Sequence, residues 1–149
     1  MTKSLPPKSL VLYADDDLDD IELVRDAFEQ YAQGIQLLTF RDGSELLRYV
    51  KELKDFEPLP CLIILDINMP NLDGKQTLSA IRRMDRYEAV PIVLFSTSTL
   101  PSEAAFAKSF GAGFVTKPLH TLQINQLVDQ MIHHCTDDVK SFFKSRKGK

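Results

Sequence analysis

The chain has 149 residues, of which 44% are hydrophobic and 26% charged, so it fits one folded domain and argues against a disordered or fibrous protein. No apolar run approaches the roughly 18–20 residues that cross a membrane, and residues 1–9 lack the apolar stretch of a signal peptide. The formal net charge is -3, but residues 140–149 hold five basic residues and no acidic one, which leaves 13 basic against 21 acidic residues elsewhere. An acidic body with a basic tail argues against a DNA-binding domain.

Short apolar runs alternate with amphipathic stretches in the first half of the chain. Residues 10–14 and 35–40 are apolar and short, which predicts two strands. The stretch between them has apolar side chains at helical spacing, at Ile21, Val24, Phe28 and Tyr31. We expect this helix to begin near Leu18 with Asp17 as its cap. A turn at 41–43 precedes a second predicted helix over 46–53.

The second half continues the alternation. Residues 62–65 form the most apolar and β-branched run so far, which predicts the central strand of a sheet. A third helix is predicted over 78–84, and a fourth strand over 92–95. The next predicted helix begins at Pro101 and ends at Gly111, because proline favours the first helical turn and glycine the end.

A brief strand over 114–116 and an amphipathic helix over 122–135 complete five β/α units. Five such units in succession predict an α/β fold, a doubly wound, flavodoxin-like five-stranded parallel sheet with helices on both faces. We assign residues 1–136 to this domain and 137–149 to a short basic tail. Two cysteines without metal-binding spacing, Cys61 and Cys135, suit a reducing compartment, so we expect a cytoplasmic protein.

Polar residues follow four of the five predicted strands. Three successive aspartates, Asp15, Asp16 and Asp17, follow the first strand. One polar residue follows each of the third, fourth and fifth strands, and these are, in that order, Asp66, Ser96 and Lys117. Because ligands of open parallel sheets bind at the carboxyl ends of the strands, we expect these side chains to meet at one edge. Clustered carboxylates suit Mg²⁺, and a carboxylate beside it can attack a phosphoryl group to form an acyl phosphate. A hydroxyl and an ammonium can then bind the phosphoryl oxygens.

These residues and their neighbours resemble the receiver domain of two-component response regulators. The resemblance covers residues 9–135 and rests on a set of short motifs: Asp15-Asp16, Leu65-Asp66-Ile67-Asn68-Met69-Pro70, Asp73-Gly74, Ser96 and Lys117-Pro118. The run 18–24 and the length of the chain resemble the small stand-alone receivers of the phytochrome-associated type.

The resemblance implies a role for each site residue. Asp66 is the implied phosphoacceptor, and the implied Mg²⁺ ligands are Asp66, Asp16, the backbone carbonyl of Asn68 and, through a water molecule, Asp15. Ser96 and Lys117 are the implied partners of the attached phosphoryl group. Ser96 and Phe114 occupy the family's switch positions, although core packing explains Phe114 equally well.

The implied function is phosphorelay signalling. A sensor histidine kinase or a histidine phosphotransfer protein donates a phosphoryl group to Asp66. The domain catalyses only its own phosphorylation and dephosphorylation and is not otherwise an enzyme. The switched surface then changes its affinity for a partner protein, for which a second copy of the chain is one candidate, giving a homodimer. We expect no DNA and no membrane among its partners.

Two other classes use related folds. A phosphatase of the haloacid dehalogenase type also has an aspartate nucleophile and Mg²⁺, but it requires a second aspartate at the position that Asn68 occupies. A flavodoxin-like flavin or nucleotide binder requires a glycine-rich or hydroxyl-rich phosphate loop after the first strand. The three aspartates at 15–17 would repel a phosphate there.

Overall fold

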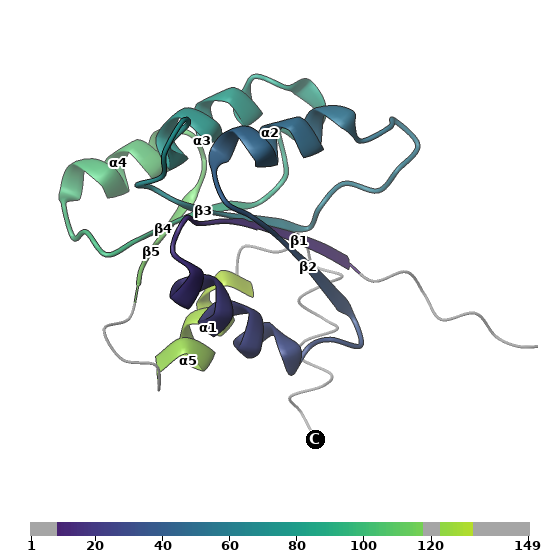
Figure 1. The fold of residues 1–149 in the computed structure, drawn as a ribbon. Helices are drawn as coiled ribbons and strands as arrows, with labels where there is room; N and C mark the ends of the chain where they lie inside the picture. Colours follow the sequence, from purple (N-terminus) through teal and green to yellow (C-terminus); the bar gives the residue numbers. More distant parts are fainter. Residues whose placement is uncertain (1–8, 118–122, 133–149) are drawn as a thin grey trace, which may run out of the picture.

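A computed structural model of the protein describes residues 9–117 and 123–132. Five strands form one sheet in which every pair is parallel (Figure 1). Their order is β2-β1-β3-β4-β5, and their bounds are β1 Ser9–Ala14, β2 Ile35–Phe40, β3 Leu62–Asp66, β4 Ile92–Ser96 and β5 Gly113–Thr116. The run 62–65 is therefore the central strand, as predicted, and the flavodoxin-like parallel sheet is confirmed.

Helices cover both faces of this sheet (Figure 1). The two that lie on one face are α1 (Leu18–Glu29) and α5 (Ile124–Ile132). Those on the opposite face are α2 (Gly43–Glu52), α3 (Gly74–Arg82) and α4 (Pro101–Ser109), with a short 3-10 turn, η1 (Asp85–Tyr87), after α3. Alternate residues of the strands pack into two separate hydrophobic clusters, one beneath each helical layer. Both faces of the sheet are therefore buried, and the packing of the strands determines where their ends lie.

The predicted starts of α1 and α4 are confirmed, whereas α2 and α3 begin at Gly43 and Gly74, before the predicted starts at 46 and 78. The Asp17 side chain accepts hydrogen bonds from the backbone N–H groups of Asp19 and Asp20, so it is the predicted cap of α1. Pro101 is the first residue of α4, and Gly111 follows that helix with a positive φ of 66°. The predicted helices extend too far at their carboxyl ends, because Tyr31, Leu53 and Met84 lie beyond the helices. Apolar residues in the turn after a helix can continue its buried stripe without continuing its backbone.

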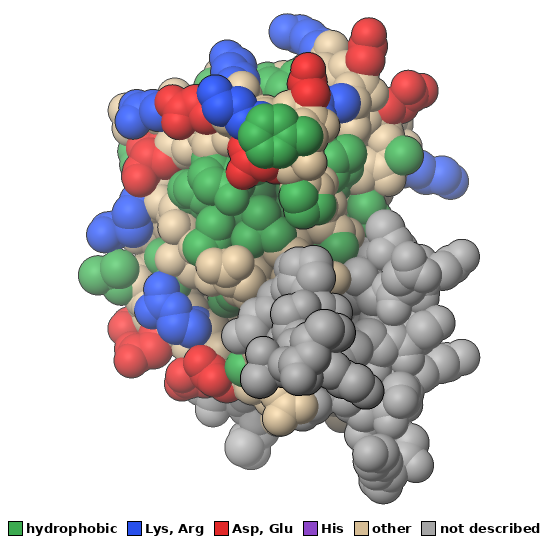
Figure 2. All heavy atoms as spheres, turned by 90° about the vertical axis from the view of Figure 1, so that its right-hand side faces the viewer, with side chains coloured by type: hydrophobic (Ala, Val, Ile, Leu, Met, Phe, Trp, Pro, Cys, Tyr) green, Lys and Arg blue, Asp and Glu red, His purple; other side chains and the backbone are tan. Residues whose placement is uncertain are grey.

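Parts of the sequence-based prediction lie outside the described residues. These are both ends of the last predicted helix, Pro118, Cys135 and the basic tail. Among the described residues, no helix combines the length and apolarity needed to cross a membrane. Seen from the side where the α2–β3 segment and the start of β1 lie, the surface shows hydrophobic side chains surrounded by charged ones (Figure 2). Phe56 and Leu59 of that segment are exposed, whereas Cys61 is buried.

Candidate functional site

The carboxyl ends of four strands bring the predicted polar residues together at one edge of the sheet. Asp15 directly follows β1, Asp66 ends β3, Ser96 ends β4 and Lys117 follows β5. Strand order reverses between β1 and β3, which is where parallel sheets of this type bind ligands. The backbone N–H of Lys117 donates to the Ser96 carbonyl at 2.6 Å, which fixes the start of the lysine side chain beside β4.

Lys117 is the electrostatic centre of the site. Its buried ammonium lies 2.9 Å from Asp15 Oδ2, 2.8 Å from Asp20 Oδ2 and 3.0 Å from Asp66 Oδ1. Burial by itself would lower the pKa of Lys117, but hydrogen bonds to Asp20 and Asp15 raise it above its usual value. The lysine therefore stays charged, and it ties together groups from β1, α1, β3 and β5.

Asp15 is fully buried, and both of its oxygens have donors. Oδ2 accepts from the Tyr13 hydroxyl and from Lys117 Nζ, while Oδ1 accepts from the backbone N–H of Asp17 at 3.0 Å. Burial, the charge of Asp15 and the hydrogen bond from the Tyr13 hydroxyl to Asp15 all raise the pKa of Tyr13, so the phenol remains a proton donor. Tyr13 reaches the site from the hydrophobic cluster under α1, where its ring packs edge-on against Phe95.

Removal of the Tyr13 hydroxyl is expected to lower stability. Tyr13→Phe leaves a buried carboxylate oxygen with one donor fewer, which costs about 2 kcal/mol of unfolding free energy for a hydrogen bond to a charged group. Urea denaturation in metal-free buffer measures this loss. Tyr49→Phe is the matched control, because the Tyr49 hydroxyl makes no hydrogen bond within the described part of the chain. Equal and small losses for the two variants would contradict the role assigned to the Tyr13 hydroxyl.

The acidic cluster at this edge has the composition of a site for a hard cation. Asp15, Asp16 and Asp66 each offer a carboxylate oxygen, and these oxygens lie within 4.8 Å of one another. Asp16 is exposed, and its carboxylate has no hydrogen-bond or ion-pair partner among the described residues. One positive charge on Lys117 faces more than one negative charge, so a divalent cation would relieve the remaining repulsion. These residues therefore fit Mg²⁺.

Asp66 is the second buried carboxylate of this cluster. Burial first, and then the charge of Asp15, raise the pKa of Asp66 to about 7, while Lys117 acts in the opposite direction. Lys117 bonds Oδ1 of Asp66, whereas Oδ2 has no partner within the described part of the chain. Lys117 thus orients one oxygen of Asp66, and the other has no partner among the described residues. A cation that binds here would favour the ionised carboxylate.

This raised pKa predicts how stability depends on pH in the absence of Mg²⁺. The unfolded chain releases the Asp66 proton near 3.8, whereas the folded protein keeps it up to a pKa of about 7. The stabilisation is therefore complete below pH 3.8 and is lost as the pH rises through about 7, at about 1.4 kcal/mol per pH unit at most. Urea denaturation from pH 4 to about 8 should show this fall. Asp66→Asn should show a flatter profile, and parallel profiles would contradict the prediction.

Ser96 is buried, and its position suits a hydroxyl that binds an incoming group. Its Oγ accepts a hydrogen bond from the backbone N–H of Ser98 at 3.0 Å. No described residue accepts its hydroxyl proton, which leaves that proton available as a donor. Phe114 lies on β5 and is half-buried against the hydrophobic cluster beneath α2, α3 and α4. Phe114 therefore contributes to core packing, which is one of the two roles that the sequence allows for it.

The segment between β3 and α3 is held close to Asp66. A side chain on Gly74 would place its Cβ 2.2 Å from the backbone oxygen of Asp66, so only glycine fits there. Asn71 has a positive φ of 65° and donates from Nδ2 to Asp42 Oδ2 at 2.8 Å. Hydrogen bonds from Ser44 and the backbone of Glu45 hold the pKa of Asp42 at about 2. Asn68 is exposed within this anchored segment.

Two further residues, which the sequence analysis does not single out, belong to the site. Tyr13 reads as part of an apolar strand, and Asp20 reads as one of several acidic residues in the first turn of a helix. Their contacts with Asp15 and Lys117 depend on tertiary packing, since Asp20 and Lys117 are separated by 97 positions in the chain. The repeated aspartates before and within the first turn of α1 were the only sequence signal that could have suggested Asp20.

The chain is similar to known regulatory proteins. The chain is 31% identical to the response regulator Rcp1 of Synechocystis over 98 residues, which span 64% of this chain and 66% of Rcp1. It is 28% identical to the probable methanogenesis regulatory protein FilR2 of Methanothrix harundinacea, across 82% of this chain and 80% of that one.

Solved structures show the same fold. The phosphorylated cyanobacterial phytochrome response regulator RcpA superposes with a TM-score of 0.78 at 24% identity, covering 89% of this chain and 96% of RcpA. The Mn²⁺-bound form of Rcp1 gives a TM-score of 0.73 at 24% identity, covering 83% of this chain and 91% of Rcp1. Residues 11–129 match the response regulator receiver domain family, so the chain belongs to that family of two-component signalling proteins.

Proposed function

We propose that this receiver domain accepts a phosphoryl group on Asp66 from the phosphohistidine of a histidine kinase or a histidine phosphotransfer protein. The observation that carries the proposal is the arrangement of Asp66 itself. One of its oxygens is paired with Lys117, and the other has no partner among the described residues. The carboxylates of Asp15 and Asp16 each place an oxygen within 4.8 Å of an oxygen of Asp66. This combination of an oriented nucleophile and a cation-binding cluster is what phosphoryl transfer to a carboxylate requires.

The chemistry follows from these side chains. An oxygen of ionised Asp66 attacks phosphorus, and a P–O bond forms as the P–N bond to the donor imidazole breaks. The electron pair of the broken bond stays with the imidazole nitrogen. Asp15, Asp16, Asp66 and the Asn68 carbonyl would hold Mg²⁺. When bound, this ion offsets negative charge on the transferring oxygens.

The attached group then has two partners of complementary chemistry. The Ser96 hydroxyl has a proton to donate, and Asp66 Oδ1, the partner of the Lys117 ammonium, becomes an uncharged carbonyl oxygen when Asp66 is an acyl phosphate, so the ammonium is better paired with the phosphoryl oxygens. The modification adds a charge of roughly -1.5 to -2 at the edge of the sheet. Movement of Ser96 towards this charge would shift the segment between β4 and α4, and Phe114 would repack beside it. We infer that a partner protein reads this change.

Two relatives support the proposal from outside the chain. RcpA has been crystallised in a phosphorylated form and Rcp1 with Mn²⁺ bound, and both share this fold. A phosphatase of the haloacid dehalogenase type is disfavoured because the chain matches the receiver family and has Asn68 where that class needs an aspartate.

Incubation with acetyl phosphate and Mg²⁺ tests the proposed function. The intact protein should gain the mass of one phosphoryl group, and EDTA should prevent the gain. Turnover of a phosphate ester substrate by the protein would indicate a phosphatase instead. No uptake from acetyl phosphate or from a phosphorylated histidine kinase, with Mg²⁺ present, would overturn the proposal.

A further inference from the structure

We propose that Asp20 is a positioning residue that holds the Lys117 ammonium in place while this lysine exchanges its Asp66 contact for a phosphoryl contact. The inference rests on the proposed function and deepens it. Asp20 Oδ2 lies 2.8 Å from Lys117 Nζ, which is the shortest of the three ion-pair distances of this lysine. Asp20 is also the only one of the three acceptors that lies outside the acidic cluster suited to a metal ion.

Three carboxylates surround the Lys117 ammonium in the unmodified protein. The ammonium donates hydrogen bonds to Asp15 and Asp20, and it forms an ion pair with Asp66 at 3.0 Å. When Asp66 carries a phosphoryl group, only the contact to Asp66 has to change. Asp20 and Asp15 can keep the hydrogen bonds that they accept from Lys117. The ammonium can then turn towards the new charge without leaving its position.

Asp20 and Lys117 both line a small pocket within the described part of the chain. The ring of Phe95 lies under the ammonium, with 5.2 Å between Nζ and the ring centroid. The pocket, of about 20 Å³, lies between α1 and α5 and is lined by Asp20, Leu23, Val24, Phe95, Lys117 and Ile124. That volume holds about one water molecule. Without the Asp20 carboxylate, the ammonium could turn into this pocket and away from Asp66.

Asp20 is itself well fixed. It lies in the first turn of α1, and its backbone N–H donates to the cap residue Asp17 at 3.2 Å. Its side chain is 30% exposed, so the carboxylate keeps part of its contact with water. A helix start also favours a negative charge. The position is therefore suited to a permanent anchor for a cation.

Fluoroberyllate, a non-covalent mimic of the phosphoryl group, provides an equilibrium test in the presence of Mg²⁺. Asp20→Ala should weaken its binding by about tenfold, as expected for loss of a hydrogen bond to a charged group. Asp20→Asn keeps an acceptor oxygen and should restore part of this loss. Asp19→Ala is the matched control, because it removes the same charge from the same turn without contacting Lys117, and its affinity should stay near that of the unaltered protein.

A double variant separates positioning from general electrostatics. If Asp20 acts through Lys117, Asp20→Asn should change affinity in the unaltered protein but not in a Lys117→Met background. Equal effects in both backgrounds, or equal affinities of Asp20→Ala and Asp19→Ala, would overturn the inference. Failure of the unaltered protein to bind fluoroberyllate or to take up a phosphoryl group would instead contradict the proposed function. Urea denaturation of each variant identifies any general loss of folding.

Discussion

Asp66→Asn is expected to abolish phosphoryl uptake from acetyl phosphate. The amide has almost the shape of the carboxylate, but its nitrogen and oxygen are poor nucleophiles, and it carries no charge to bind a cation. Mass spectrometry of the intact protein after incubation with acetyl phosphate and Mg²⁺ measures the result. We expect full modification of the unaltered protein at saturation and none of the variant.

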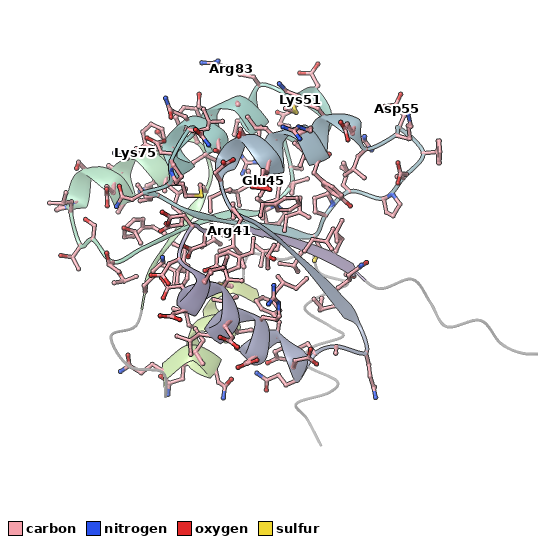
Figure 3. The ribbon with its side chains drawn as sticks, in the orientation of Figure 1. Arg41, Glu45, Lys51, Asp55, Lys75 and Arg83 are labelled. Carbon is pink, nitrogen blue, oxygen red and sulfur yellow. The ribbon has the colours of Figure 1, made fainter. Side chains whose placement is uncertain are left out.

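The same variant should fold well, which keeps its interpretation simple. Its change removes a buried negative charge that burial and Asp15 both disfavour, so stability in metal-free buffer at pH 8 should not fall. Asp55→Asn is a suitable control, since Asp55 is exposed on the α2–β3 segment, away from the site (Figure 3). Phosphoryl uptake by Asp66→Asn at the level of Asp55→Asn would show that another residue is the acceptor.

Lys117→Met is expected to produce the largest loss of stability. Methionine replaces the lysine stem with a similar volume, but Asp15 and Asp66 are left buried without their shared cation. Removing one partner of a buried ion pair typically costs about 3–5 kcal/mol, because the remaining charge is uncompensated. Urea denaturation in metal-free buffer at pH 8 measures the loss.

Mg²⁺ should restore much of the stability that Lys117→Met loses. The ion should therefore stabilise this variant more than it stabilises the unaltered protein. The ion would take over the neutralising role of the ammonium at the carboxylates of Asp15 and Asp66. The matched control is Lys51→Met, because Lys51 is exposed on the outer side of α2 (Figure 3). If the two lysine variants lost similar, small amounts of stability, Lys117 would not be the electrostatic centre of the site.

The fold and the parts of the site were predictable because they depend on local patterns. Runs such as 62–65 are too short and too β-branched to be helices, so they identify strands. Once the strands are placed, parallel topology brings their carboxyl ends to one edge. The sequence alone therefore predicts that Asp15, Asp66, Ser96 and Lys117 meet there.

What could not be predicted depends on packing between distant segments. The hydroxyl of Tyr13 points from the hydrophobic cluster to Asp15, although strand alternation only indicates a buried side. Nothing in the first turn of α1 distinguishes Asp20, which bonds Lys117, from Asp19, which does not. The link from Asn71 to Asp42 likewise joins two loops that are 29 positions apart. Each contact is decided by three-dimensional arrangement rather than by local sequence.

The most direct test of the account is to locate the phosphoryl group in the unaltered protein. After incubation with acetyl phosphate and Mg²⁺, borohydride reduction converts an aspartyl phosphate to homoserine, and peptide mass spectrometry identifies the modified position. We predict a single modified residue, Asp66. A modification at any other residue, or none under conditions in which a known receiver domain is fully modified, would contradict the account.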